Sequence, residues 1–411
     1  MGRVALLLQK PDRLLAKNWT THLLPTQCRQ SHVGKVIDTL GVWSIIGVTV
    51  HCNHFFQQEI YMHRRTFSTA LAAMGCGALS GVSTSTEAQS STNVAFALFP
   101  GYRALMKQHV FDPYSKANPQ VIIAPLEGPA SQTYAQLLAS PPSSRSIQGG
   151  MMNDALSWAG VNTKLWDPMT AKDVPNLAKV PAELRNDAGI PWVFNAFGIS
   201  YNPEKLPNGI DSWNDLYSPS LKGKVAMWPA YFDAYVMAAV AAGGGSTEIE
   251  KGIERWKKAK DNIGMWITSI AELHQAMHRG EIWAAPDYLS TTVRDAKAGM
   301  KLAMSLPVEG AVLNTYQLES VSGNSAAQRQ AVAGLINSSL GDQTQAAAFE
   351  SAYLTPANAA VKVDARKGEI PGLKGYDFSA SEAVKRFYKV DYKWVGANGS
   401  KIKKLIEDNL H

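Results

Sequence analysis

Residues 191–227, PWVFNAFGISYNPEKLPNGIDSWNDLYSPSLKGKVAM, contain four local signals of different shape in succession. The apolar run at 192–202 predicts one long extended segment, and the prolines within 203–207 predict the turn that ends it. A short helix is expected at 213–217, and residues 222–227 lead into a further strand. The stretch therefore opens a second structural unit of the chain.

The chain on both sides of this stretch alternates short apolar runs with segments of helical spacing. Such alternation predicts an α/β fold with a mainly parallel sheet. In these sheets ligands bind beyond the carboxyl ends of the strands, which here means the loops at 100–102, 128–132 and 153–154. Further strands are expected at 93–99, 121–126, 146–152, 282–288 and 302–320, and helices at 101–117, 132–139, 231–242, 246–260, 269–279, 324–340 and 342–353.

The length of 411 residues predicts two domain-sized units. The formal net charge of +6 is unevenly distributed along the chain. Eight of the 40 Lys and Arg residues and four of the 34 Asp and Glu residues lie in residues 1–88, which leaves 32 basic and 30 acidic residues, a charge of +2, from residue 89 onward. Bulk charge therefore does not support nucleic-acid binding, and no nucleic-acid partner is expected.

All three cysteines, Cys28, Cys52 and Cys76, precede residue 89. The remainder of the chain therefore cannot use disulfides, thiolate chemistry or cysteine-ligated zinc. A body without cysteine suits an oxidising compartment.

Residues 62–88 have the layout of an export signal. The pair Arg64-Arg65 precedes a modestly apolar run at 67–79, which is too short to span a bilayer, and residues 86–88 offer a small-residue cleavage site. The Arg-Arg pair followed by Thr-Phe resembles the twin-arginine export signal. A periplasmic location is therefore expected.

An export signal should lie at the start of a chain, whereas this signal begins only at Met62. Residues 1–61 show no sustained helix or strand periodicity. We expect translation to start at Met62 and residues 1–61 to be a non-functional upstream extension. A lipid anchor at Cys76 is an alternative, although residues 73–75 lack the leucine usual in such signals.

The succession of signals in 191–227 resembles a segment of family 1 extracellular solute-binding proteins, in the branch that handles polyamines, ferric iron and related small solutes. Weaker similarities follow later in the chain, and the resemblance covers roughly residues 93–400. The parts that carry it are 198–202, Leu206-Pro207, Ser212-Trp213 with Asp215-Leu216, 221–225, 280–281, 284–288, 307–311 and 345–358.

The resemblance implies a type II periplasmic-binding fold, in which two α/β lobes are joined by two crossover strands and a ligand is held between them. The long extended runs at 192–202 and 308–320 fit the crossovers. The expected division is 89–197 for the first part of lobe 1, 198–309 for lobe 2, and 310–411 for the second part of lobe 1 with the C-terminal helices. The implied function is a monomeric receptor that delivers a small molecule to an ABC permease in the inner membrane.

Aromatic and acidic residues at predicted strand ends are the candidates for ligand contact. Aromatic faces attract organic cations, and carboxylates accept hydrogen bonds from an ammonium group. The resemblance implies this combination for amine-binding members, which makes a polyamine or related organic cation the expected ligand and Asp287 the first candidate. The full set is Tyr102, Ser131, Asp154, Phe197, Trp228, Tyr231, Asp233, Asp287, Tyr288, Glu309 and Tyr316.

Each candidate also has an ordinary structural explanation. Tyr102 and Trp228 could be packing aromatics. Asp154 could cap the helix that follows it, and Asp233 could be a first-turn acid favoured by the helix dipole. Asp287 follows Pro286 within an apolar run and is harder to explain in this way.

Metal and cofactor sites are not expected. The chain has no Tyr-Tyr pair of the kind typical of ferric-iron sites in this family. His274 and His278 are spaced to share one face of a helix, but their segment has the character of an exposed helix end.

Motifs for catalysis are absent from the sequence: there is no HExxH, GxSxG or GxxxxGK[ST]. A non-enzymatic receptor is therefore expected. The alternatives are an enzyme on the same two-lobed fold, which would need a cleft group with a strongly displaced pKa, and a ligand-sensing module for a membrane receptor.

Overall fold

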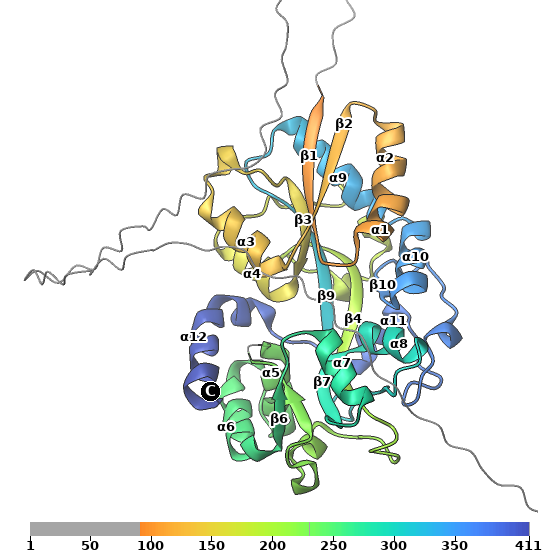
Figure 1. Cartoon of the computed structure of the whole chain (residues 1–411). Helices are drawn as coiled ribbons and strands as arrows, with labels where there is room; N and C mark the ends of the chain where they lie inside the picture. The colour runs from red at the N-terminus through yellow and green to blue at the C-terminus, as the bar shows by residue number, and fades with distance from the viewer. Residues whose placement is uncertain (1–90, 230, 411) are drawn as a thin grey trace, which may run out of the picture. The chain divides into compact units, whose positions relative to one another are not determined.

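The computed structural model describes residues 91–229 and 231–410 as a mixed α/β structure built on one large sheet (Figure 1). The main strands, in their order across the sheet, are β2 (Val121–Glu127), β1 (Thr92–Leu98), β3 (Gly149–Asn153), β9 (Ala311–Ser320), β4 (Ile190–Tyr201), β7 (Ala284–Tyr288), β5 (Val225–Met227) and β6 (Ile263–Trp266). β1 pairs in parallel with β2 and β3, and β5 pairs in parallel with β6 and β7. The predicted α/β class is confirmed.

Strands β4 and β9 connect the two halves of the sheet. β4 pairs antiparallel with β9 from Ile190 to Phe197 and with β7 from Phe197 to Tyr201. β9 also pairs with β3, and so β4 and β9 join a first lobe containing β1–β3 to a second lobe containing β5–β7. Every residue of β4 is buried, which explains why its sequence is mostly apolar at successive positions and does not alternate with polar residues.

The helices cover the sheet in both lobes (Figure 1). The helix expected at 101–117 is interrupted by a π-helical segment, Lys107–Phe111, just before Pro113, whose ring nitrogen cannot donate a backbone hydrogen bond. The helices are α1 (Arg103–Met106), α2 (Asp112–Ala117), α3 (Ala130–Ala139), α4 (Asp154–Asn162), α5 (Phe232–Ala241), α6 (Ile249–Lys258), α7 (Ile270–His278), α8 (Leu289–Lys297), α9 (Ala326–Ser339), α10 (Asp342–Ala352), α11 (Ala380–Arg386) and α12 (Tyr392–Leu410); short strands lie at β8 (Ala303–Ser305), β10 (Thr355–Pro356) and β11 (Phe387–Tyr388).

Each lobe has its own large hydrophobic core. Trp192 lies in the core of the first lobe and Trp256 in that of the second, and both are fully buried. Ile402 and Ile406 of α12 belong to the core of the second lobe. Gly396 of the same helix lies against Ala155 and Ala159 of α4 in the first lobe, so α12 packs on both lobes.

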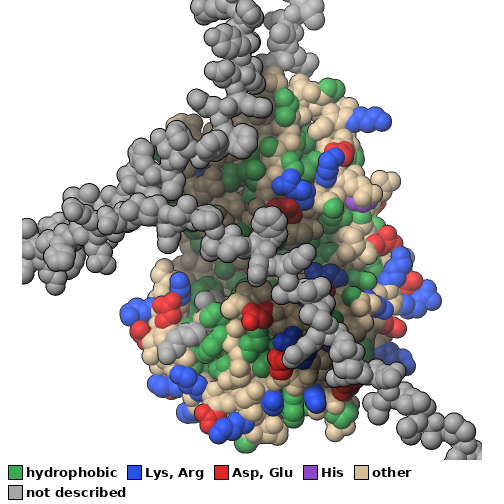
Figure 2. All heavy atoms as spheres, in the orientation of Figure 1, with side chains coloured by type: hydrophobic (Ala, Val, Ile, Leu, Met, Phe, Trp, Pro, Cys, Tyr) green, Lys and Arg blue, Asp and Glu red, His purple; other side chains and the backbone are tan. Residues whose placement is uncertain are grey.

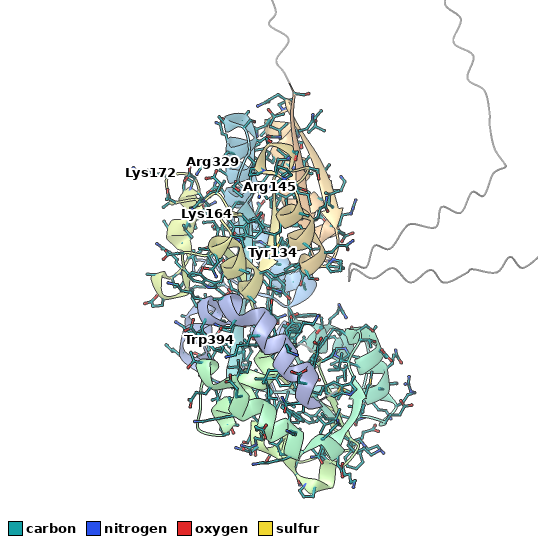
Figure 3. All side chains as sticks on the ribbon, turned by 90° about the vertical axis from the view of Figure 1, so that its left-hand side faces the viewer. Tyr134, Arg145, Lys164, Lys172, Arg329 and Trp394 are labelled. Atoms are coloured by element: carbon teal, nitrogen blue, oxygen red, sulfur yellow. The ribbon has the colours of Figure 1, made fainter. Side chains whose placement is uncertain are left out.

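Polar contacts also fasten loops to the lobes. Arg145 and Arg329 both lie in the first lobe (Figure 3). Arg329 of α9 pairs with Asp167 at 2.6 Å and with Asp173 at 2.7 Å, and Arg145 donates to the carbonyl oxygen of Ser322 at 2.9 Å. On the face seen in Figure 2, basic and acidic side chains are interspersed. The part of that face not covered by grey atoms shows no extended patch of one charge.

The expectations for residues 1–61, for the export signal at 62–88 and for Cys76 lie outside the described residues. Within residues 91–229 and 231–410, none of the helices combines the length and apolar character needed to cross a membrane.

A glycine in the contact between α5 and α6 gives a test of this packing. A Cβ at Gly252 would lie 2.0 Å from the carbonyl oxygen of Tyr235, which is backbone and cannot move aside easily. We expect Gly252→Ala to lower the free energy of unfolding by about 1–3 kcal/mol in urea denaturation, despite the better helix propensity of alanine.

Gly399 of α12 is the matched control, because a Cβ there would meet only ring carbons of Phe232 at 3.7 Å and 3.8 Å. Gly399→Ala should raise stability by about 0.5–1 kcal/mol. Equal effects of the two substitutions would contradict the close approach of α5 and α6.

Candidate functional site

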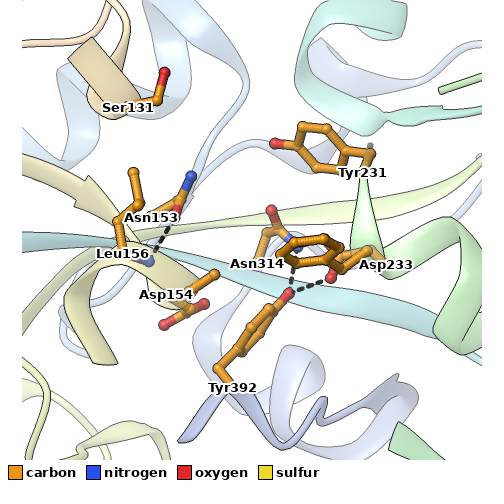
Figure 4. A pocket seen from close by; sticks show the side chains of 10 residues that line it. Ser131, Asn153, Asp154, Leu156, Tyr231, Asp233, Asn314 and Tyr392 are labelled. Carbon is orange, nitrogen blue, oxygen red and sulfur yellow. Dashed lines mark hydrogen bonds between the residues drawn. The ribbon is translucent and has the colours of Figure 1, made fainter. Parts of the chain in front are cut away.

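A cleft lies between the two lobes and consists of two cavities that share Asn153 and Tyr231. The first, the acidic cavity, has a volume of about 230 Å³, and the second, the aromatic cavity, about 410 Å³. The acidic cavity is lined by Ser131, Asn153, Asp154, Ala155, Leu156, Tyr231, Phe232, Asp233, Asn314 and Tyr392 (Figure 4). The aromatic cavity is lined chiefly by Phe99, Tyr102, Asn153, Tyr231, Tyr288, Ser290, Thr291, Arg294 and Tyr316.

The fold brings these side chains together at strand ends. Asn153 ends β3, Tyr288 ends β7, and the loops predicted at 100–102, 128–132 and 153–154 all contribute to the cleft. This is where ligands meet parallel sheets. The crossover strand β9 adds Asn314 and Tyr316 from the sheet itself.

Asp233 is a buried carboxylate set back in the wall of the acidic cavity. Its two oxygens accept hydrogen bonds from Asn314 Nδ2 at 2.8 Å and from the Tyr392 hydroxyl at 2.8 Å (Figure 4). Burial raises the pKa of Asp233 to about 6, although both hydrogen bonds act in the opposite direction. Asp233 also lies in the first turn of α5, as the structural explanation expected, and it serves the cavity as well.

Asp154 is a second buried carboxylate in this cavity. It accepts hydrogen bonds from the backbone N–H of Thr315 at 2.6 Å and from Gln317 Nε2 at 2.8 Å. Burial raises the pKa of Asp154 to about 7, and the nearby Asp233 adds to the rise. Asp154 does not cap α4, because the Asn153 side chain does so by accepting from the N–H of Leu156.

The capping bond of Asn153 leaves its side-chain NH₂ facing the cavity. In Figure 4 this group and the Tyr231 hydroxyl point toward each other from opposite lobes. A ligand between them could accept from Asn153 and exchange a hydrogen bond with Tyr231. The two lobes thus offer complementary polar groups to one guest.

Tyrosine rings from both lobes line the aromatic cavity. On one side the ring centroid of Tyr316 lies 6.0 Å from that of Tyr102 and 4.9 Å from that of Phe99, all in edge-on geometry. On the other side Tyr231 and Tyr288 have centroids 5.6 Å apart. Such rings can present their π faces to a cationic ligand.

Seven of the eleven predicted residues line the cleft, and Asp287 does not. Asp287 is fully buried, and its Oδ2 contacts His274 Nε2 at 2.7 Å and accepts from the Thr292 hydroxyl at 3.0 Å. Its carboxylate is therefore engaged inside the second lobe, which corrects its expected place in the cleft. The residues that do line it are Tyr102, Ser131, Asp154, Tyr231, Asp233, Tyr288 and Tyr316.

Phe197, Trp228 and Glu309 also fall outside both cavities. Phe197 is buried and stacks behind Tyr231 at a centroid distance of 5.7 Å. Trp228 donates to the Pro286 carbonyl oxygen at 2.8 Å and its ring packs on Tyr231. These two aromatics therefore support the cavity wall without forming it.

Glu309 lies outside the cleft and accepts hydrogen bonds at the start of the short helix Trp213–Tyr217. It accepts hydrogen bonds from the N–H of Trp213 at 3.2 Å, from Asn214 Nδ2 at 2.9 Å and from the Ser212 hydroxyl. Its expected ligand role is corrected, because the carboxylate fixes a turn near the crossover.

His274 is fully buried, not part of an exposed helix end as expected. Its Nδ1 lies 2.6 Å from Asp295 and its Nε2 2.7 Å from Asp287. Burial alone lowers the pKa of His274, but these carboxylates outweigh it and the net shift is upward. His278 faces elsewhere and accepts from the N–H of Lys301. In the described part of the chain, no group of His, Cys, Asp and Glu could hold a metal ion.

Several cleft residues were not predicted from the sequence. Asn314 and Tyr392 come from β9 and from the start of α12, which meet only in the folded chain. Arg294 is neither an acid nor an aromatic residue and lies one and a half turns into α8, away from any strand end. Asn153 lies in the predicted loop at 153–154. The Asn-Asp pair at the end of a strand was the sequence signal that could have identified it as a cleft residue.

Comparison with known proteins identifies the wider group. The sequence profile of the family described as "Bacterial extracellular solute-binding protein" matches residues 109–369. The spermidine/putrescine-binding periplasmic protein of Escherichia coli (strain K12) is 25% identical over 147 residues, which is 34% of this chain and 41% of that protein. The chain therefore matches about two-fifths of the length of this curated relative.

Solved structures share the fold at low identity. A crystal structure of an ABC transporter protein from Clostridium perfringens ATCC 13124 has a TM-score of 0.65 at 19% identity, covering 77% of this chain and 100% of that one. The spermidine/putrescine ABC transporter substrate-binding protein of Streptococcus pneumoniae has a TM-score of 0.61 at 13% identity, covering 78% and 100%. The predicted type II periplasmic-binding fold is thus confirmed.

The buried His274 yields a prediction about stability. His274→Gln leaves the buried Asp287 without its cation, while Asp295 keeps Arg294, and should lower the free energy of unfolding by about 3–5 kcal/mol at pH 6. Because the pKa of His274 is raised in the folded protein, its contribution is fully present below the unfolded pKa of about 6.5 and is lost as pH rises through the folded pKa.

The measurement is urea denaturation of wild type and variant from pH 6 upward, with His278→Gln as the control. The difference between wild type and His274→Gln should shrink as pH rises, while His278→Gln should stay within about 1 kcal/mol of wild type. A difference that is independent of pH would show that His274 is not held as an imidazolium.

Proposed function

This chain belongs to the family of bacterial extracellular solute-binding proteins, and from that premise we propose that it captures a small organic cation, a polyamine or related amine. The cation is held between the lobes and delivered to an ABC permease in the inner membrane. The curated relative that binds spermidine and putrescine supports this choice of ligand.

The observation that carries the proposal is the buried Asp233 beside tyrosine rings in the cleft. Asp233 lies behind the acidic cavity with a second carboxylate, Asp154, and Tyr231 lines both cavities. A carboxylate can neutralise an ammonium group, and a tyrosine face can attract it. This pairing suits a cationic guest better than a neutral sugar.

Closure of the two lobes is the proposed mechanism of capture. Asn153 belongs to the first lobe, Tyr231 to the second, and Asn314 to the crossover strand. A ligand that contacts all three is bound more tightly when the lobes are closed, and so it shifts the population toward the closed state. No covalent step on the ligand is required.

Two carboxyl groups with raised pKa in one cleft are also a feature that an enzyme on this fold would need. Here both groups already accept two hydrogen bonds each from neighbouring protein donors. A bound cation would lower both pKa values by favouring the charged forms. We therefore assign Asp154 and Asp233 to cation binding and not to proton transfer.

Export by the twin-arginine route to the periplasm is part of the proposal and rests on residues 62–88. N-terminal sequencing of protein recovered from the periplasm should give a start near residue 89. A peptide from residues 1–61 in that material would contradict both the signal and the start at Met62.

The ligand proposal predicts stabilisation by amines. In a thermal-shift screen of polyamines, quaternary ammonium compounds and amino acids, a true ligand at one hundred times its Kd adds about 2.7 kcal/mol to stability. Asp233→Asn removes the charge beside the cavity, and should weaken binding of that amine at least about tenfold in calorimetry.

Asp261→Asn is the matched control, since Asp261 is an exposed acid of the same lobe that pairs with Lys222. The affinity of the Asp261→Asn variant for the amine should remain close to that of wild type. If no amine-containing compound raises the melting temperature, the proposed function is wrong.

A further inference from the structure

An arginine lies on the wall of the aromatic cavity, whereas Asp233 lines the acidic cavity. Arg294 of α8 lines the aromatic cavity but not the acidic one. Burial raises the pKa of Tyr102, and the charge of Arg294 acts against that rise. The guanidinium of the second lobe is therefore within electrostatic range of a first-lobe tyrosine across the cleft.

Arg294 is held in a defined orientation. Asp295 accepts from its Nε at 2.6 Å and from its Nη2 at 3.0 Å. The Arg294 side chain is 54% exposed and that of Asp295 only 13%, so the carboxylate lies behind and the guanidinium is presented outward. Nη1 and one Nη2 hydrogen remain for a ligand, because these two bonds use only two of the five N–H donors.

The charge behind Arg294 is balanced by a buried relay. Asp295 contacts His274, and His274 contacts Asp287. With His274 as an imidazolium, the four groups carry two positive and two negative charges. The relay therefore holds Arg294 in place without adding net negative charge around it. The guanidinium can still attract an anion.

The buried hydroxyl of a tyrosine that lines the same cavity lacks a partner. Tyr288 is 8% exposed, and its hydroxyl is buried without any hydrogen bond in the described structure. A buried hydroxyl without a partner is unfavourable, and a ligand oxygen in the aromatic cavity would satisfy it. Tyr288, Thr291 and Arg294 all line this cavity, and Thr291 and Arg294 lie three residues apart on one face of α8.

We infer that the ligand is a zwitterion, with an oxyanion group, carboxylate or phosphonate, bound by Arg294 and the Tyr288 hydroxyl, and an ammonium group directed toward Asp233. The inference rests on the proposed function, capture of an amine between the lobes, and replaces the polyamine by an amine that also carries an anionic group. The N-terminal turn of α8 adds donors and a favourable dipole for the anion. A polyamine would instead place a second ammonium beside the guanidinium, where like charges repel.

The test uses matched probes that differ only in one end group. Calorimetry compares 4-aminobutanoate, 5-aminopentanoate and 6-aminohexanoate with the α,ω-diamines of the same chain lengths and with 1-aminobutane, and 3-aminopropylphosphonate distinguishes the two oxyanions. We expect a zwitterion to bind at least tenfold more tightly than its diamine.

Two variants test the assigned groups, with Arg279→Gln as control because Arg279 is an exposed arginine of the same lobe that pairs with Glu281. Arg294→Gln should weaken binding of the zwitterion at least tenfold and leave the affinity for 1-aminobutane within about threefold of wild type. Tyr288→Phe, which keeps the ring, should weaken the zwitterion severalfold. Arg279→Gln should change neither the affinity for the zwitterion nor that for 1-aminobutane.

Each remaining outcome is decisive. If diamines bind as tightly as the zwitterions, or if Arg294→Gln and Tyr288→Phe leave the preference unchanged, the zwitterion assignment is overturned while the proposed function stands. If no probe in any series binds, including 1-aminobutane, the proposed function fails and the inference with it.

Discussion

The antiparallel pairing of β4 with β9 is the constraint on which the rest of the structure depends. From Ile190 to Phe197 the two strands share one ladder, and beyond Phe197 strand β4 continues into the second lobe against β7. Two buried strands therefore make the connection between lobes stiff along the ladder. The cleft forms beside them, and Asn314 and Tyr316 of β9 reach into it directly.

This arrangement explains why binding groups come from so many parts of the chain. Each lobe presents its strand ends to the same gap, and the crossover supplies polar residues to its floor. The C-terminal helix α12 then adds the Tyr392 hydroxyl, which with Asn314 holds Asp233 in place. The charged groups are positioned by other protein groups before any ligand arrives, which reduces the entropy lost on binding.

Much of the fold could be predicted from the sequence, because local patterns determine it. Local patterns predicted the apolar run of β4 and the loops at the strand ends, and those loops do contribute to the cleft. The misplacement of Asp287 has a tertiary cause: its neighbour His274 comes from α7 and neutralises a carboxylate that by itself looked available. The packing of α12 on the second lobe, and with it the role of Tyr392, likewise depends on contacts between distant segments.

The most direct test of lobe closure is a distance measurement between spin labels across the cleft. Gln132→Cys at the start of α3 and Ala271→Cys at the start of α7 are exposed positions next to Ala130 and Ile270, which border the aromatic cavity, with Cys28, Cys52 and Cys76 replaced by serine. At saturation with an amine that raises the melting temperature, the distribution of distances should narrow and move to shorter values. An unchanged distribution at saturation would contradict capture by closure of the two lobes.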